Sequence, residues 1–208
     1  MAGLFAASLL QEAGRDVVVV ERSKAGLGGR GAGLVAQGEI YALLSRIGRD
    51  AVGEVGVMAR ERLTLDRAGS VVHHVGRAQL HLSWDHLCLT VRSTLPGGGI
   101  PGLVVEVGDG RDEAWIRLDD GTMITADLVV GADGIGSIVR PALLKTPADP
   151  RYAGYVAWRA LVPEGELPSV AGEMLSDRFA HFHMSGGQVL GCTVAGERTV
   201  EKVRKQEK

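Results

Sequence analysis

The fold of this chain is constrained most by an apolar run that ends in a glycine turn, residues 127–140 (DLVVGADGIGSIVR). Its first half, Leu128 to Val130, is the kind of short apolar segment that is buried on both faces in a parallel sheet. The glycines that follow break the strand, and helix-like spacing begins at Gly136. A strand, a glycine turn and a helix N-terminus allow the backbone to approach a ligand closely. The stretch therefore predicts a ligand-binding strand–turn–helix unit.

Two residues of this turn are candidate ligand contacts. Asp133 would accept a hydrogen bond from a ligand hydroxyl, and Arg140 would return toward a phosphate or brace the turn. A simpler interpretation stays open, in which Gly131 and Gly134 only turn the chain and Asp133 caps the helix. A motif this short does not decide between the two.

The start of the chain predicts a second nucleotide-binding element. Residues 2–13 are apolar almost all round, which favours a buried helix, and Gly14 suits its C-terminal end. The β-branched run Val17 to Val20 is typical of a central parallel strand, and it ends at Glu21. Helix, glycine, apolar strand and terminal acid together match the second half of a dinucleotide-binding βαβ unit.

Two residues of this half-unit are candidate contacts as well. Gly3 would be the third glycine of G-x-G-x-x-G, which permits close helix–strand packing, and Glu21 would bind the ribose hydroxyls of an adenosine. The first strand and the first two glycines would have to precede Met1, so we expect the chain to begin inside the motif. The alternative is that Glu21 is a solvated residue at a strand end.

Patterns elsewhere predict further helices and short strands. Helical spacing covers residues 39–47 and 83–95, and the second segment carries Arg92, which is an exposed helical arginine in the simplest interpretation. Short strands are predicted at residues 63–65, 71–72, 103–107, 114–118, 122–125, 155–162, 178–184 and 188–194. The glycine-rich segment 26–38 is either a ligand-facing loop or a surface loop. The charged tail from Gly196 is expected to be helical or frayed.

Composition narrows the classes of function. Among 208 residues, 45% are hydrophobic and 23% charged, with a net charge of −2, which is ordinary for a soluble globular protein and argues against nucleic acid as partner. No apolar run is long enough for a membrane span. Cys88 and Cys192 lie far apart, which favours reduced thiols in a cytoplasmic protein. The histidines lack a third ligand at recognisable spacing, so no metal site is predicted.

Three features in one order carry a family resemblance: VVVV followed by Glu21 and Arg22, the DLVVGADGIGSIVR stretch, and YAGYVAWR at residues 152–159. The chain resembles the FAD-dependent aromatic-ring monooxygenases with the para-hydroxybenzoate hydroxylase fold. The segments SWDHL at 83–87 and YAGYVAWR look most like the 2,6-dihydroxypyridine 3-monooxygenase branch. The resemblance covers nearly all of the chain.

The resemblance implies an α/β fold with a Rossmann-like FAD-binding domain. That domain would contain a parallel sheet and a β-meander over residues 1–147, followed at 148–208 by the beginning of an antiparallel substrate-domain sheet. It implies that Gly3, Glu21 and Arg22 hold the adenosine of FAD. Asp133 and Gly134 would then contact the pyrophosphate and ribityl region, and the cofactor-binding residues would be completed by Arg140 and, as a weaker match, Arg92.

The same resemblance implies a reaction. Reduced nicotinamide (NADPH or NADH) would reduce the flavin, and O2 would then supply the hydroxyl transferred to a small, electron-rich aromatic substrate. The cofactor carries the hard chemistry, so no catalytic side chain is assigned. Neither a nucleic-acid nor a membrane partner is implied, and a homodimer is left open.

The sequence differs from the family pattern at both ends. The N-terminal end lacks the first strand with its glycines, and the C-terminal end stops before the family's later G-D motif, so the chain is expected to be a fragment. Two alternative functions also stay open. One rival is a nicotinamide-binding Rossmann reductase, against which hairpins stand where further βα units should follow Gly48. The other is a non-catalytic remnant or interaction module.

Overall fold

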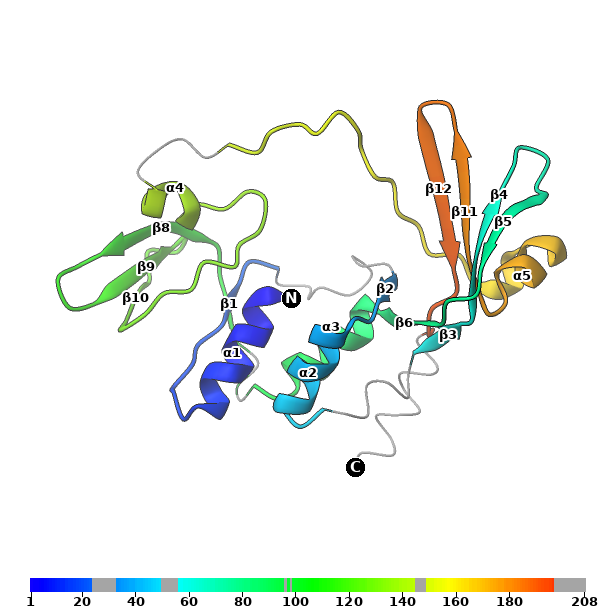
Figure 1. The fold of residues 1–208 in the computed structure, drawn as a ribbon. Helices are drawn as coiled ribbons and strands as arrows, with labels where there is room; N and C mark the ends of the chain where they lie inside the picture. Colours follow the sequence, from blue (N-terminus) through cyan, green and yellow to red (C-terminus); the bar gives the residue numbers. More distant parts are fainter. Residues whose placement is uncertain (24–32, 50–55, 96, 98, 145–148, 197–208) are drawn as a thin grey trace. The chain divides into compact units, whose positions relative to one another are not determined.

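The computed structural model describes residues 1–23, 33–49, 56–95, 97, 99–144 and 149–196 (Figure 1). The chain forms two compact units, and each combines two separate stretches of sequence. Unit 1 contains Met1–Leu27 and Val91–Trp158, and unit 2 contains Gly28–Thr90 and Arg159–Lys208. The expected domain boundary between residues 147 and 148 stays a prediction, because these units are defined by contacts and not by chain order.

Unit 1 begins with helix α1 (Ala2–Glu12), as the apolar N-terminal segment predicts. The helix buries Leu4, Phe5 and Ala7, and the Ser8 hydroxyl donates to the Leu4 carbonyl and bonds the Thr94 hydroxyl at 2.8 Å. Strand β1 (Val20–Glu21) then pairs in parallel with β7 (Ile100–Pro101). A helix followed by a parallel strand is the half-unit expected from the sequence.

A three-stranded meander completes unit 1. Strands β8 (Val104–Asp109), β9 (Ala114–Leu118) and β10 (Met123–Ala126) form an antiparallel sheet in the order β10-β9-β8. Gly121 has φ +88° in the turn between β9 and β10, a backbone conformation that glycine adopts without strain. The meander leads into the glycine turn and the short helix α4 (Val139–Leu144).

Unit 2 contains two sheets. One has the order β2-β6-β3 and the other the order β12-β11-β4-β5. The strands are β2 (Gly33–Val35), β3 (Val57–Ala59), β4 (Glu61–Leu65), β5 (Val71–Val75), β6 (Gln79–Ser83), β11 (Arg178–Met184) and β12 (Gly187–Cys192). The helices are α2 (Gly38–Arg46), the 3-10 turn η2 (Glu164–Glu166), α5 (Ser169–Leu175) and most of α3 (Trp84–Arg92), whose last two residues belong to unit 1. Strand β11 runs antiparallel to β12 and parallel to β4, so this sheet is mixed.

Several sequence predictions are confirmed and three strands are not. The hairpins, the meander, α2 and α3 occur where predicted, although α3 ends at Arg92. The predicted strand over Val17–Val20 is reduced to Val20–Glu21, and residues 128–130 and 155–162 are not strands. A strand forms only where a neighbour accepts its hydrogen bonds, and in the described ranges no strand is paired with either segment.

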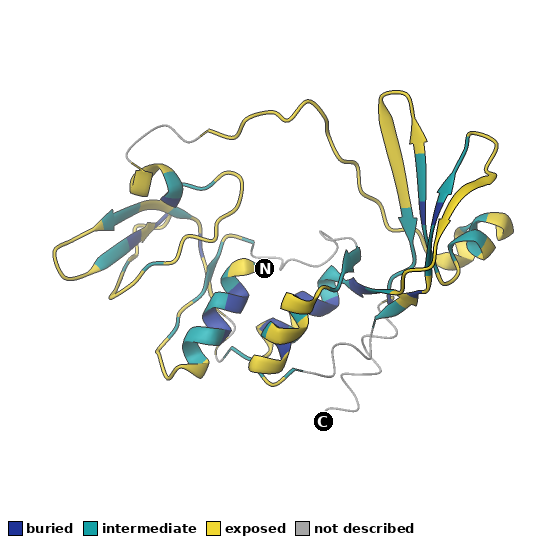
Figure 2. Cartoon of the chain, in the orientation of Figure 1, coloured by how far each residue is buried: buried dark blue, intermediate teal, exposed yellow. Residues whose placement is uncertain are grey.

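The side chains of the two segments that form no strand are largely exposed to solvent. Leu128 is 63% exposed and Val130 51%, against the expected burial on both faces, and Trp158 is 94% exposed. Residues 149–166, in the segment that leads to α5, are exposed (Figure 2). Helix α5 was not expected, because only strands are suggested after residue 150. The glycine-rich loop up to residue 32 and the charged tail from residue 197 lie outside the described residues.

Candidate cofactor site

The glycine turn at residues 131–134 is held against both α4 and α1. A Cβ added to Gly131 would lie 2.6 and 2.7 Å from Cγ1 and Cβ of Val139, so only glycine fits there without a shift. Gly134 has φ +80°, in the left-handed region that favours glycine. A Cβ on Gly3 would meet the Cβ of Ala132 at 3.0 Å. The first turn of α1 therefore packs tightly against this turn, and the role of Gly3 as the third glycine of a dinucleotide motif stays a prediction.

Asp133 organises the entry into α4. One carboxylate oxygen, Oδ2, accepts hydrogen bonds from the backbone N–H groups of Ile138 at 2.8 Å and Val139 at 3.3 Å. Burial on its own raises the pKa of Asp133, but hydrogen bonds from Ser137, Val139 and Ile138 outweigh it and hold the pKa below its ordinary value. The carboxylate is therefore ionised at neutral pH. Asp133 accepts N–H groups at the start of α4 as a capping side chain does, although it lies before the flanking N-cap position because α4 begins only at Val139. Its contact with a ligand hydroxyl stays a prediction.

Arg140 braces the same turn. Its guanidinium donates from Nη2 to the carbonyl of Gly134 at 2.7 Å and from Nη1 to the carbonyl of Ile135 at 3.4 Å. The backbone N–H of Arg140 in turn donates to the Ser137 hydroxyl at 3.0 Å. The sequence predicts that Arg140 either contacts a phosphate or braces the turn, and the structure shows that it braces the turn. Ser137 was not singled out, although a serine three residues before a helical N–H has the spacing of a capping hydroxyl.

A cavity of about 280 Å³ opens beside these groups. It is lined by Gly131, Asp133, Gly134, Ser137, Val139, Arg140, Leu143 and Leu144. One wall carries the polar backbone of the turn, an ionised carboxylate and a guanidinium, and the other carries exposed leucines. Such a lining suits a ligand with both polar and apolar parts.

The remaining predicted residues lie at other places. Glu21 ends β1, and its Oε1 accepts the backbone N–H of Ser23 at 2.8 Å, which tightens the turn after the strand. Arg22 and Arg92 are exposed, the second at the end of α3. The structure thus brings Gly3, Asp133, Gly134 and Arg140 to one turn and places Glu21 on a strand end of the same unit. Cofactor binding by Glu21, Arg22 and Arg92 stays a prediction.

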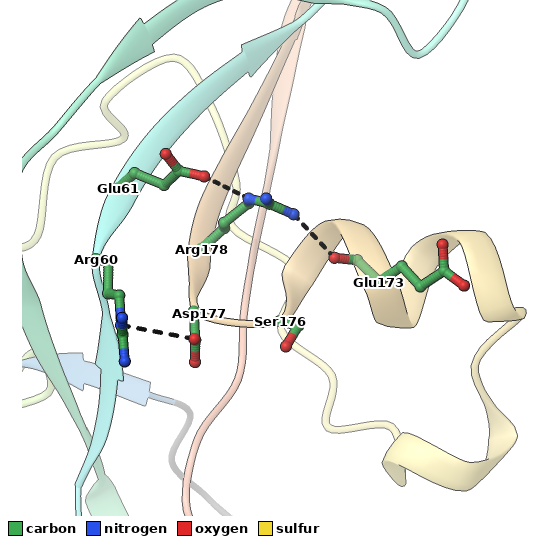
Figure 3. A pocket seen from close by; sticks show the side chains of 6 residues that line it. All are labelled: Arg60, Glu61, Glu173, Ser176, Asp177 and Arg178. Carbon is green, nitrogen blue, oxygen red and sulfur yellow. Dashed lines mark hydrogen bonds and ion pairs between the residues drawn. The ribbon is translucent and has the colours of Figure 1, made fainter.

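A second cavity, of about 470 Å³, lies in unit 2 (Figure 3). It is lined by Arg60, Glu61, Glu173, Ser176, Asp177 and Arg178. Its charges pair with one another: Glu61 with Arg178, and Arg60 with Asp177 at 3.7 Å. Hydrogen bonds from Arg178 and His74 hold the pKa of Glu61 below its ordinary value. This mutual pairing makes the cavity a structural ion-pair network that ties β4 to β11.

An Asp133→Ala variant is expected to lose about 1 kcal/mol of unfolding free energy, because two N–H groups at the start of α4 lose their acceptor. Asp133→Asn keeps an oxygen acceptor at the same place and should retain most of the stability. Urea unfolding followed by the fluorescence of Trp115, which lies in unit 1, measures the difference. Equal stability of the alanine variant and the parent would contradict the cap.

Comparison with known proteins shows what this chain is similar to. A model of FAD binding domain-like proteins matches residues 152–206. The chain is 30% identical to the 2,6-dihydroxypyridine 3-monooxygenase of Paenarthrobacter nicotinovorans, over 98% of this chain and 51% of the relative. It is 34% identical to the 3-amino-4-hydroxybenzoate 2-monooxygenase of Streptomyces cremeus, over 96% of this chain and 53% of the relative. The chain thus spans about half the length of the curated relatives it matches.

Solved structures agree in fold. The 2,6-dihydroxypyridine-3-hydroxylase from Arthrobacter nicotinovorans superposes with a TM-score of 0.86 at 30% identity, covering 95% of this chain and 50% of that one. HpxO of Klebsiella pneumoniae, solved with FAD and uric acid, has a similar fold with a TM-score of 0.77 at 23% identity, covering 93% of this chain and 51% of that one.

Within the described ranges, no helix is both long and apolar enough to cross a bilayer.

The turn, the half βαβ unit and the meander all occur in the order that the resemblance implies. By sequence and by fold, the chain is similar to FAD-dependent aromatic-ring monooxygenases over about half of a relative's length.

Proposed function

We propose that this chain forms the FAD-binding part, and some of the substrate-domain sheet, of a monooxygenase that hydroxylates an electron-rich aromatic or heteroaromatic ring. NADPH or NADH and O2 would be the co-substrates. The observation that supports the proposal best is the contact of Gly3 with Ala132, which joins the two nucleotide motifs of the sequence at one turn. Similarity over 98% of the chain to a relative that is a monooxygenase by name agrees with it.

The residues at the turn fit a dinucleotide. Gly134 leaves the backbone uncovered beside the cavity, and the guanidinium of Arg140 supplies positive charge next to it. We infer that Asp133 and Gly134 contact the pyrophosphate and ribityl region while Arg140 keeps the turn in shape. Gly3, Glu21 and Arg22 would hold the adenosine, with Arg92 as the weakest member of the set.

The chemistry of oxygen transfer is supplied by FAD when it is bound. The protein's own residues bind it, orient it and exclude water around it. Asp133 and Arg140 do this through backbone contacts within the turn, so their substitution would act through the shape of the site. Cytoplasmic location and a homodimer remain predictions from composition and resemblance.

Titration of the chain with FAD, followed by flavin fluorescence and calorimetry, tests the proposal. Arg22→Gln should weaken FAD binding about tenfold, equivalent to about 1.4 kcal/mol, because the exposed positive charge proposed to hold the adenosine end of FAD is lost. Arg15→Gln, at another exposed arginine of unit 1, is the matched control and should leave the affinity unchanged.

Parallel titration with NADPH separates the rival functions. A nicotinamide-binding reductase would quench the fluorescence of Trp84, Trp115 or Trp158 with NADPH and not with FAD. A non-catalytic remnant would respond to neither. The proposal is wrong if the chain, saturated with FAD and then separated from the free flavin by gel filtration, carries no flavin absorbance.

A further inference from the structure

Residues 155–162 form an apolar segment that runs outside the helices and strands (Figure 1). The segment lies between Gly154, which has φ +91°, and Pro163, which has no backbone N–H. It is rich in the β-branched and aromatic residues that favour strands, and its only charged residue is Arg159. Unit 1 ends at Trp158 and unit 2 resumes at the next residue, so these residues are called the linker segment.

The linker segment is open to solvent in both its side chains and its backbone. Trp158 is 94% exposed, Tyr155 73% and Val156 67%, and Leu161 and Val162 are each more than half exposed. Among the backbone hydrogen bonds and strand pairs of the described residues, none involves the linker segment. Natural proteins usually protect such an edge with lysines, a proline or a covering element, and the linker segment contains neither lysine nor proline. It is therefore available for strand pairing.

Two copies of the linker segment can pair with each other as antiparallel strands. Side chains alternate between the two faces of a strand, and a two-fold axis perpendicular to the strand pair keeps a given residue on the same face in both copies. Cross-strand neighbours also share a face, so the two residue numbers of each opposed pair must be both odd or both even. One register that meets this condition sets Trp158 opposite Trp158 of the second copy. It pairs residues 155–161 of one copy with the same residues of the other.

The side chains favour this register over its neighbours. With the two Trp158 rings opposed, Tyr155 lies opposite Leu161, and both are aromatic or apolar cross-strand pairs that stabilise sheets. The next register toward the C-terminus sets Arg159 opposite Arg159, and like charges directly opposite are destabilising. The next register toward the N-terminus leaves Leu161 unpaired, because the strand cannot continue past Gly154 with its positive φ. The register centred on Trp158 therefore pairs the most apolar side chains without opposing two charges.

The charges beside the linker segment favour the antiparallel direction. Arg151 precedes the segment and the acidic turn η2, with Glu164 and Glu166, follows it. An antiparallel pair brings Arg151 of each copy to η2 of the other, whereas a parallel pair would bring Arg151 beside Arg151. Asp149 lies beyond the paired residues. Exposed ion pairs are worth at most about 1 kcal/mol each, so they select the direction and do not drive the association.

The size of the contact sets the expected affinity. An aromatic side chain buries roughly 150–250 Å² when covered, so the four rings of Trp158 and Tyr155 in two copies supply at most roughly 600–1,000 Å². Stable and specific interfaces bury about 1,200 Å² or more. The pair is therefore expected to be a weak, reversible dimer and not an obligate one.

We propose that the linker segment binds a second copy of this chain and forms a two-fold symmetric, antiparallel strand pair centred on Trp158. The two Trp158 rings contact each other across the axis, and Tyr155 of each copy packs on Leu161 of the other. The inference goes beyond the proposed function and does not depend on flavin binding, because no residue proposed to contact FAD lies in the linker segment.

Sedimentation velocity of the 208-residue chain tests the association. The chain should pass from monomer to dimer between about 1 and about 100 μM, the range in which a weak dimer dissociates. Amide hydrogen exchange followed by NMR tests the pairing itself and needs no variant. Every second amide from Tyr155 to Leu161 should be protected in the dimer and not in the monomer, because successive N–H groups of a strand point to opposite edges.

Variants show whether the named residues are responsible. Trp158→Lys should weaken dimerisation at least tenfold, because two positive charges would then lie opposite each other. Val170→Lys, at a 69% exposed position of α5, is the matched control and should dimerise like the parent. The parent dimer should also show exciton coupling between two indole rings in its circular dichroism. Trp158→Phe should remove that signal and still dimerise, which distinguishes Trp158 from Trp84 and Trp115.

The inference is overturned if the chain stays monomeric at about 100 μM, or if Trp158→Lys dimerises as well as the parent. Slow exchange of the linker segment in a monomer would show that another part of the same chain covers it, which also overturns the inference. So would oligomers that grow with concentration beyond the dimer, since they indicate open-ended association.

The same measurements with and without FAD separate this inference from the proposed function. Dimerisation should be equal in both conditions. A chain that binds FAD and stays monomeric refutes only the strand pair. A chain that dimerises through the linker segment and ignores FAD refutes only the cofactor assignment.

Discussion

Gly131→Ala is expected to lower the free energy of unfolding of unit 1 by about 1–3 kcal/mol, the usual cost of overpacking a filled site. The new methyl group would lie 2.6 and 2.7 Å from Cγ1 and Cβ of Val139. Val139 is only 8% exposed, and its β-branched side chain has little rotational freedom in a helix. The backbone of the turn must therefore move. Urea unfolding followed by Trp115 fluorescence measures the loss.

Gly136→Ala is the matched control for this substitution. Gly136 belongs to the same stretch, a Cβ there would meet nothing within 4 Å, and its φ is not in the left-handed region. The control should be neutral or slightly stabilising, because alanine restricts the unfolded chain. If both variants unfold at the same urea concentration, the close approach of Gly131 to α4 is not a feature of the protein. In a flavin-binding form of the protein, only Gly131→Ala should also weaken FAD.

Acidification from pH 7 to pH 5 is expected to destabilise unit 2. His81 is 1% exposed, and burial holds its pKa in the folded protein below the value of about 6.5 for an unfolded histidine. Below pH 6.5 the unfolded chain binds the proton first, so stability falls with pH until the folded pKa is reached. The slope is at most about 1.4 kcal/mol per pH unit for each such histidine. His181, whose pKa is also lowered, acts in the same direction.

His81→Leu should flatten this pH dependence, because a neutral side chain of similar size replaces the titrating one. The exposed His73→Gln controls for the loss of an imidazole elsewhere on the sheets. Carboxylates with lowered pKa values, such as Glu61 and Asp133, titrate below the window and do not interfere. Unfolding curves at pH 5, 6 and 7 give the slopes, and equal slopes for His81→Leu and the parent would show that His81 is not buried as a neutral ring.

Local sequence patterns correctly predict the hairpins and helices whose conformation depends on neighbouring residues. The hairpin between β9 and β10 needs a glycine with positive φ, and Asp120-Gly121 supplies it. Helix α2 follows from the spacing of its apolar residues and ends before Gly48, which has φ +69°. These features depend on a few neighbouring residues, so they can be read from the sequence alone.

Strand pairing depends on partners that local patterns do not identify. Residues 128–130 and 155–162 have the composition of strands, yet they form none among the described residues, because composition does not supply a hydrogen-bonding neighbour. Asp133 was undecided for a different reason. An acidic side chain near the start of a helix can serve either as a cap or as a ligand contact, so only the geometry distinguishes them.

The parallel pairing of β4 with β11 has a consequence during synthesis. Glu61 and Arg178, which join the two strands, are separated by 117 positions. At roughly 5–20 residues per second on the ribosome, strand β11 is synthesised about 6–23 s after β4. During that interval one edge of β4 lacks its neighbour, and the nascent polypeptide is most open to chaperones and proteases there.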